Sequence, residues 1–597
     1  MANTTFTSGE LVTATKLNTV NPSIISTGST AARTLAVRAA DEVNVADYGT
    51  GSSAFKLACA AIQTKGGGVL NLETNTTYTI DWRTEGAGAY VTFSSLKGVT
   101  INGNGSTLLG VDAVYVSGSD NGIAGGARQM LEFSAVDGLT INDLKLQGTY
   151  NTHTTDPDHS DTYGEIGIWL RNGTQFVKLN NTYALNLNQF FDVSDYTDTN
   201  GRENAKVSGI VVTNPWVKHC RYGFAFYQSG DNVEIINARC FNCVRSYRVH
   251  NVANHDVRIY SEPSFTSSDV LISSLADSRW TRADNTTKNI KLSYESPKRF
   301  DGYTQDDQAF YDALITLQVL DETANDTAIN PSGTVAPGFL ENIDINLNVQ
   351  ASTTSSQILT ITKRYGTGAV GSGTASDNTG VTRGHKIDGI RISGRVRGWS
   401  TAHIYDAEVS QKGVAIRLPD GFHTANEMNW AGDVVRNIVI DNLVTEGDPS
   451  GTYSNGGHPN DGEDFNLIEI TGDAVGSTDK RVMITNSSIE GKIGYSNFAA
   501  GTNLPVLINS TSNNRKANQG AVDTVAAWVK FSGNTEVEGV LQPPVISDSY
   551  NVSSVSRMST GRYSIVLSVT MNNANYVVVG SARIEATFGT IFHPDAS

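Results

Sequence analysis

The sequence has little of what marks several familiar classes of protein. Charged residues make up 17% of its 597 positions, below the roughly 25% that is usual in soluble domains. Its four cysteines are too few to form a disulfide framework in a chain of this length. There is no run of eighteen apolar residues, so we expect no membrane-spanning helix. The N-terminal stretch MANTTFTSGE has no basic region followed by an apolar one, so we expect no signal peptide.

Positive charge is scarce as well. The formal net charge is −16, and no basic stripe could neutralise the phosphates of a nucleic acid or bind an anionic lipid surface. A neutral or weakly charged polymer remains as a partner, or an acidic polymer met through a local basic patch.

Glycine is plentiful, with 57 residues, and serine, threonine and asparagine are abundant. A recurrent pattern runs through the middle of the chain: a small residue or Asn/Asp, then alternating branched apolar residues, then Asn or Gly. Examples are GVTINGNG at 98, GLTINDLKLQG at 138, FVKLNN at 176, NVEIINARC at 232 and NIKLSYE at 289. Copies that begin at 206, 232 and 256 lie 26 and 24 residues apart, and the largest gap is the 53 residues from 289 to 342. Strand repeats of this size with variable insertions predict a solenoid.

A short helix precedes the repeats. Phe55, Cys59 and Ile62 share one face of a helix over 53–65, with Ser52 or Ser53 as N-cap, and Gly66–Gly68 end it. A helix in this position would cover the open edge of a solenoid's first coil. The sequence therefore predicts an all-β fold, a parallel β-helix with a capping helix.

The chain divides into three predicted parts. Residues 1–42 are an N-terminal segment, 43–520 the β-helix, and 521–597 a small C-terminal β domain that contains Trp528 and the run YVVVG at 576. The segment DDQAFYDALITLQVL has Phe310, Leu314 and Leu317 at helical spacing, which predicts a helical insertion near 298–340.

The two ends of the chain resemble a known family. DEVNVADYGTGSSAFKLACAAIQ, followed by GGGVLNLETNTTYTI, resembles the opening of the pectate-lyase-like superfamily of right-handed parallel β-helices, as found in bacteriophage tail spikes. FTSGELVTATKLN (6–18) is similar to the peptide that attaches such proteins to the virion tail, and AWVKFSGN with ANYVVVGSA is similar to a small domain that ends many tail fibres. GTGSS stands where the family has an aspartate-rich turn.

This resemblance implies a homotrimeric tail spike or fibre of the virion, made in the host cytoplasm and attached to the tail through residues 1–42. It would bind host surface polysaccharide during adsorption and depolymerise it. A non-enzymatic, adhesive receptor-binding fibre is the alternative. A free bacterial polysaccharide lyase is a third reading, which the attachment-like peptide and the lack of a signal peptide disfavour.

Four consecutive coils, aligned by their inward apolar residues, place a dense polar patch on one outer face. The aligned stretches are IGIWLRN, QFFDVSDY, GFAFYQ and SYRVHN. The outward residues are Trp169, Arg171, Asp192, Tyr227, Arg248 and His250, with Glu165 and Asp195 at the edges. Aromatic faces stack on sugar rings, and the flanking charges can hydrogen-bond hydroxyl groups or a uronate.

The chemistry of this patch has three interpretations. In a glycosidase, Asp192 would act with Glu165 or Asp195 as the pair of catalytic carboxyl groups. In a lyase, Arg248 or His250 with Tyr227 would neutralise a carboxylate and abstract a proton. All of these side chains could also be ordinary solvated residues of an outer face.

No cofactor or metal is predicted. Cys240 and Cys243 form a CxxC, and Cys220 precedes it by about one coil, which suits zinc in spacing alone. A ladder of small buried residues inside the solenoid explains the same three cysteines without a metal.

Overall fold

The computed structural model describes the chain in segments. These are residues 23–24, 33–34, 42–85, 88–111, 128–150, 165–194, 206–263, 268–276, 285–296, 314–321, 338–350, 358–365, 385–399, 416–420, 434–447, 466–471, 482–489, 492–496, 506–508, 510–512, 528–532, 536–537, 540–541, 543–550, 552–559 and 562–567. The chain forms two compact units, Met1–Lys516 and Ala517–Ser597, and each is described by itself. The predicted attachment peptide at 6–18 lies outside the described residues.

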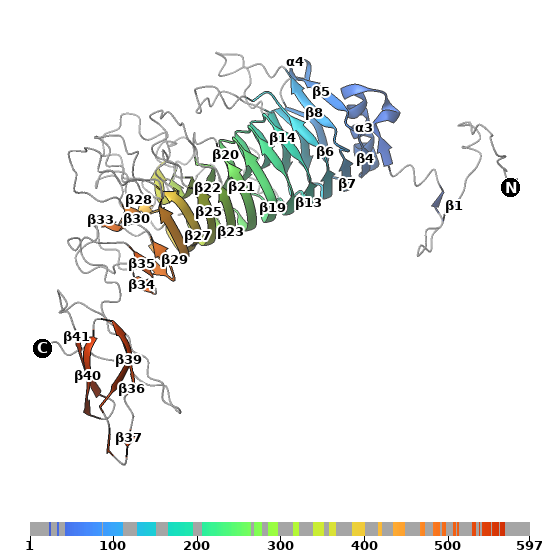
Figure 1. Cartoon of the computed structure of the whole chain (residues 1–597). Helices are drawn as coiled ribbons and strands as arrows, with labels where there is room; N and C mark the ends of the chain where they lie inside the picture. The colour runs from blue at the N-terminus through green and yellow to red at the C-terminus, as the bar shows by residue number, and fades with distance from the viewer. Residues whose placement is uncertain are drawn as a thin grey trace, which may run out of the picture. The chain divides into compact units, whose positions relative to one another are not determined.

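The first unit is a right-handed parallel β-helix, as predicted, in which strands from successive coils pair in parallel and stack along one axis (Figure 1). Each early coil contributes one strand to each of three ladders. The first ladder contains β3 (Glu42–Asn44), β4 (Gly68–Asn71), β7 (Lys97–Asn102), β10 (Asp137–Asn142), β13 (Gln175–Asn180) and β16 (Ser208–Thr213). The second contains β5 (Thr77–Asp81), β8 (Thr107–Val111), β11 (Lys145–Gln147), β14 (Tyr183–Leu185) and β17 (Trp216–Lys218).

Further along, one long strand per coil runs through both the first and the second ladder. These strands are β19 (Asp231–Phe241), β21 (Ala253–Glu262), β23 (Thr286–Ser296), β25 (Phe339–Gln350), β27 (Lys386–Trp399) and β29 (Val434–Gly447). Shorter strands then follow: β31 (Val482–Thr485), β32 (Ser488–Ile489), β34 (Val506–Ile508) and β35 (Thr511–Ser512).

The third ladder is a separate sheet of twelve strands. It contains β6 (Gly88–Ser94), β9 (Arg128–Ser134), β12 (Glu165–Arg171), β15 (Gln189–Ser194), β18 (Tyr222–Tyr227), β20 (Arg245–His250), β22 (Val270–Ala276), β24 (Ile315–Asp321), β26 (Leu359–Tyr365), β28 (Ile416–Asp420), β30 (Asn466–Thr471) and β33 (Lys492–Ser496).

The remaining described strands pair antiparallel. In the second unit they are β36 (Trp528–Ser532), β37 (Glu536–Val537), β38 (Val540–Leu541), β39 (Val545–Tyr550), β40 (Val552–Ser559) and β41 (Arg562–Leu567). Near the N-terminus, β1 (Ser23–Ile24) pairs with β2 (Arg33–Thr34).

The core of the β-helix is built from columns of inward side chains. In the first ladder one column runs through residues that pair in register and are all buried: Val99, Leu139, Val177, Ile210 and Val233. In the third ladder, Phe93 stacks on Phe133 with ring centroids 5.1 Å apart. The alternation of apolar and polar residues in the sequence produces these columns because successive side chains of a strand point to opposite faces.

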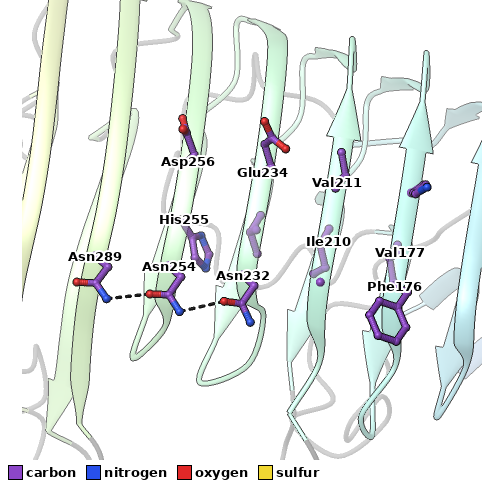
Figure 2. Close-up of a pocket in the computed structure, with 13 residues that line it drawn as sticks. Phe176, Val177, Ile210, Val211, Asn232, Glu234, Asn254, His255, Asp256 and Asn289 are labelled. Carbon is purple, nitrogen blue, oxygen red and sulfur yellow. Dashed lines mark hydrogen bonds between the residues drawn. The ribbon is translucent and has the colours of Figure 1, made fainter.

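From β7 to β29, each strand of the first ladder has a left-handed residue near its start, and these residues form one column across the coils. We call it the left-handed column. It contains Gly98, Gly138, Phe176, Gly209, Asn232, Asn254, Asn289, Asn342, Gly389 and Asn437, all with φ between 50° and 84°. Amide hydrogen bonds link Asn289 to Asn254 at 2.8 Å and Asn254 to Asn232 at 2.9 Å (Figure 2). Glycine and asparagine suit this conformation, and Phe176 is the exception.

The corner between the first and second ladders has its own asparagine ladder. Asn181 donates to Asp143, Asn214 to Asn181, and Asn237 to Asn214, at 3.2–3.3 Å. All four have φ near +50°. The asparagines that follow the apolar triplets of the sequence are therefore corner residues.

The helix α3 (Gly51–Lys65) covers the first coil and buries Phe55, Cys59 and Ile62, as the spacing predicts. The predicted N-cap is wrong, because Thr50 occupies the N-cap position and the Ser52 hydroxyl donates to the carbonyl oxygen of Thr79. Gly66 ends the helix with φ 80°. The 3-10 helix η1 (Val45–Tyr48) lies before α3, and the short α4 (Trp82–Glu85) follows β5.

The predicted helical insertion is wrong where the structure describes it. Residues 315–321 form β24, which pairs with β22 and β26. Ile315, Leu317 and Val319 point inward and are buried, so the local period is two rather than 3.6. The β-branched residues of ITLQV favour the strand.

Candidate functional site

The candidate site lies on the outer face of the third ladder, across β12, β15, β18 and β20. Ile168, Phe191, Phe224 and Tyr247 pair in register and are buried, as the alignment of the four coils requires. One residue further along each strand is a single outward column: Thr92, Glu132, Trp169, Asp192, Ala225 and Arg248. Two residues further on, Ser194, Tyr227 and His250 pair in a parallel column.

Asp192 lies at the centre of the site. Its side chain is only 3% exposed, and Oδ1 has no hydrogen-bond partner within the described part of the chain. Burial raises the pKa of Asp192 to about 7, against the lowering effect of the Ser194 hydroxyl and the Arg248 charge. This carboxyl can therefore hold a proton near neutral pH and give it up.

Trp169 lies one coil before Asp192 in the same column. Its Nε1 donates to Ser194 Oγ at 2.7 Å, and the Arg171 guanidinium lies 4.6 Å from the ring centroid. Arg171 also forms an ion pair with Glu132 at 3.4 Å. Glu132, which the sequence patch did not include, brings a second carboxylate to the column.

Arg248 lies on the other side of Asp192, with the small side chain of Ala225 between them. Its guanidinium is 5.1 Å from the Tyr222 ring centroid and 5.0 Å from that of Tyr227. Its Nε donates to His250 Nε2 at 2.8 Å. Because that nitrogen accepts, the proton of neutral His250 is on Nδ1 and is directed at Ser273 Oγ.

His250 is an unsuitable base. Burial, together with the charges of Arg248 and Arg245, holds its pKa well below the usual value. Its one available lone pair is engaged by Arg248. His250 and Tyr227, whose rings stack at 5.3 Å, therefore position the guanidinium.

Tyr222 is a functional candidate that the sequence alignment missed. Burial raises its pKa, but the charges of Arg248, Arg245 and Arg221 outweigh this and leave it lowered. The sequence did contain a signal for this cluster. Arg221 directly precedes Tyr222, the aromatic start of β18, and Arg245 lies one coil later.

The structure separates Glu165 from Asp192. Glu165 is four residues from Trp169 along β12, which corresponds to about 13 Å. It is fully buried and accepts hydrogen bonds from Trp82 Nε1 at 3.0 Å and from the Thr149 amide at 2.9 Å. Burial raises its pKa, and these bonds oppose the rise. Glu165 thus joins the second and third ladders, while Asp195 lies outside the described residues.

Two other regions, a groove on the first ladder and a group of buried cysteines, contain none of the site residues described above. A groove on the outer face of the first ladder is lined by Phe176, Lys178, Glu234 and Asp256 among others (Figure 2). Cys220, Cys240 and Cys243 are buried, and the described part of the chain has no group of three potential ligands placed to hold a metal. Of the helices in the described ranges, none has both the length and the apolar character needed to cross a bilayer.

No family model and no curated protein matches the sequence. Several solved structures are similar in fold at low identity. The mannuronan C-5 epimerase A-module of Azotobacter vinelandii is 12% identical, with 79% of this chain and all of that one covered and a TM-score of 0.39. An exopolygalacturonase from Thermotoga maritima is 11% identical, with 84% and 95% covered and a TM-score of 0.38. A mutant tailspike protein of E. coli bacteriophage HK620, in complex with a pentasaccharide, is 11% identical, with 84% and 71% covered and a TM-score of 0.37.

Proposed function

We propose that this chain hydrolyses a polysaccharide at the outer face of the third ladder, with Asp192 as the general acid. The observation that supports the proposal is the Asp192 carboxyl, which is buried, has a pKa of about 7 and has one oxygen without a partner. It lies beside the Trp169 ring, on which a sugar can stack. A general acid is most effective when its pKa is near the working pH.

In the proposed step, Asp192 gives its proton to the glycosidic oxygen as the bond from that oxygen to the anomeric carbon breaks. Water attacks the anomeric carbon, and a second carboxylate takes the proton of that water. Glu132 is two rungs from Asp192, about 10 Å between strands, near the roughly 6.5–9.5 Å between carboxyl groups of inverting glycosidases. Asp195 is the alternative partner.

The biological setting that we propose is the tail of a phage virion. The resemblance of residues 6–18 and 41–80 and of the C-terminal segments to tail spikes supports this, together with the β-helix itself. The spike would be a homotrimer attached through residues 1–42, and its substrate the surface polysaccharide of the host cell.

The test is Asp192→Asn, which keeps the shape of the side chain and removes its proton. We expect reducing-end release from host envelope polysaccharide to fall by about 10²–10⁴-fold, the usual contribution of a general acid. In the wild type, activity should fall as pH rises through about 7, because the acid form is lost. Asp256→Asn, an outward carboxylate of the first ladder, is the matched control and should retain full activity.

Undiminished sugar release by Asp192→Asn would refute this assignment. Binding without any cleavage by the wild type would instead indicate an adhesive fibre.

A lyase is the second candidate, and the Tyr222 cluster favours it. Tyr222, with its pKa lowered by three arginines, could abstract the proton next to a uronate carboxylate that Arg248 neutralises. Elimination would produce unsaturated products that absorb near 235 nm, and its rate would rise with pH rather than fall. Under this mechanism Tyr222→Phe would be inactive and Asp192→Asn active.

A further inference from the structure

A line of aromatic side chains lies on the outer face of the second ladder, away from Asp192. We call it the aromatic strip; it consists of Tyr183, Trp216, Phe241 and Tyr260. Successive ring centroids are 5.0, 5.7 and 6.0 Å apart, so the rings form one continuous surface along the axis of the β-helix. Trp216 is 46% exposed, which is unusual for so large an apolar side chain.

The core does not account for this strip. The residues that alternate with the rings, Ala184, Val217 and Cys240, point inward and are fully buried, so the rings themselves stand on the outside. Trp216 is exposed and the other three rings are half-buried, so the strip presents a line of partly exposed aromatic surface, which is a feature of binding sites.

Three cations flank the strip. Lys145 pairs in register with Tyr183, Lys218 is on the same strand as Trp216, and Arg239 pairs with Trp216. None of the three forms an ion pair within the described residues. Three carboxylates lie near the strip, and each accepts a hydrogen bond: Asp143 from the amide of Asn181, Glu262 from the Tyr260 hydroxyl, and Glu295, which pairs in register with Tyr260, from the amide of Asn348.

The strip leads around a coil corner to the candidate site. Arg221 follows Lys218 by three residues, and Tyr222 then begins β18. In the next coil Arg245 and Arg248 follow Phe241 by four and seven residues and lie on β20. A chain with net charge −16 thus concentrates cations and aromatic rings on one continuous band.

We infer that the aromatic strip is a second binding surface for the polymer, and that the polymer is an acidic polysaccharide whose repeating unit carries a carboxylate. The inference that the polymer is a polysaccharide rests on the proposed function. The strip and the flanking Lys145 together cross five coils, about 19 Å, so they can hold several sugar rings of an extended chain. The rings cover the apolar faces of the sugars, and the cations meet the carboxylates, which would otherwise be repelled by the acidic protein.

The test measures, by titration calorimetry at low salt, the binding of the full chain to polygalacturonate, alginate and hyaluronate. Each of these three uronate polymers is compared with its carboxyl-reduced form. The wild type should bind at least one uronate polymer, and carboxyl reduction should weaken that binding by about tenfold or more. Trp216→Ala and Lys218→Glu should each weaken it by about tenfold. Phe176→Ala is the matched control, since it removes another exposed ring from outside the strip, and it should bind as the wild type does.

Equal binding of the acidic and reduced polymers, wild-type binding by both strip variants, or no binding to any of the three would overturn the inference. A change of oligomeric mass in Trp216→Ala, measured by light scattering, would overturn it in favour of an interface with a second copy of the chain. Lys218→Glu keeps the ring and so tests the surface even if Trp216→Ala folds poorly. The proposed function fails separately, if the wild type does not cleave host envelope polysaccharide.

Discussion

At the scale of single residues, the left-handed column shows how far the sequence determines the structure. The Gly or Asn before each apolar triplet predicts a turn, and the structure places these residues at φ near +50° to +84°. Phe176 breaks the pattern in FVKLNN, and its conformation could not be predicted, because the register of the neighbouring coils imposes it. The outward position of Asp192 follows from alternation, but its burial depends on residues that are distant in sequence.

Phe176 should be strained, and replacing it should relieve the strain. A bulky residue at φ 55° costs on the order of 1 kcal/mol, and its ring, 63% exposed, recovers little by burial. We expect Phe176→Asn to raise the free energy of unfolding by about 1 kcal/mol, since asparagine occupies the same place in later coils. The measurement is the melting temperature of Phe176→Asn and of Phe176→Ala, which removes the ring but keeps the unfavourable φ. An equal gain in stability in both variants would contradict the backbone explanation.

At the scale of elements, helix and strand predictions differed in their success for a physical reason. The helix α3 was predicted because its apolar face follows a period of 3.6 and three glycines end it. The segment around Leu314 and Leu317 was assigned wrongly, because a few apolar residues in a short run fit either period. The neighbouring coils decide that this segment is a strand, because β22 and β26 provide backbone hydrogen-bond partners on both sides of it.

The cap should be essential to the first coil. Phe55 is 1% exposed and lies 5.4 Å from the Tyr78 ring centroid, so Phe55→Ala would leave a cavity under α3. We expect a loss of about 3–5 kcal/mol, and faster aggregation, because the edge of the first coil would open. Leu57→Ala, on the exposed side of the same helix, should change stability little. Melting temperatures and light scattering of both variants provide the measurement, and similar behaviour of the two would show that α3 is dispensable.

At the scale of the whole molecule, the sequence predicted the solenoid because its repeat is a property of the entire chain. The alignment of four coils placed Trp169 and Asp192 on one outer face, but it missed Glu132, which lies on β9, one coil before the aligned stretches. The β-helix also buries ionisable groups whose effects on stability oppose one another. Burial raises the pKa of Asp269 to about 6 and of Asp192 to about 7, while it lowers that of His255 to about 4.

His255 should make the β-helix sensitive to acid. Its Nδ1 accepts from the Tyr247 hydroxyl and its Nε2 donates to the Gly230 carbonyl oxygen, both at 2.6 Å, so the folded chain keeps it neutral. The unfolded chain takes up the proton near pH 6.5, so the stability that neutral His255 supports is complete above that pH. As pH falls from 6.5 to 4, about 3 kcal/mol is lost.

The measurement compares the wild type with His255→Gln, which lacks the titrating ring. Their melting temperatures should converge as pH is lowered from 7 to 4, whereas parallel curves would contradict the assignment. The difference between the two proteins removes the opposing contributions of Asp192 and Asp269, which are present in both.

The asparagine ladders have a direction. In every bond described along the corner and along the left-handed column, the amide of the later coil donates and the oxygen of the earlier coil accepts. Each coil of these ladders therefore presents side-chain oxygens to the coil that follows it in the sequence and amide groups to the coil before it. The two ends of such a ladder are chemically different, so a coil added at one end must supply donors and a coil added at the other must supply acceptors.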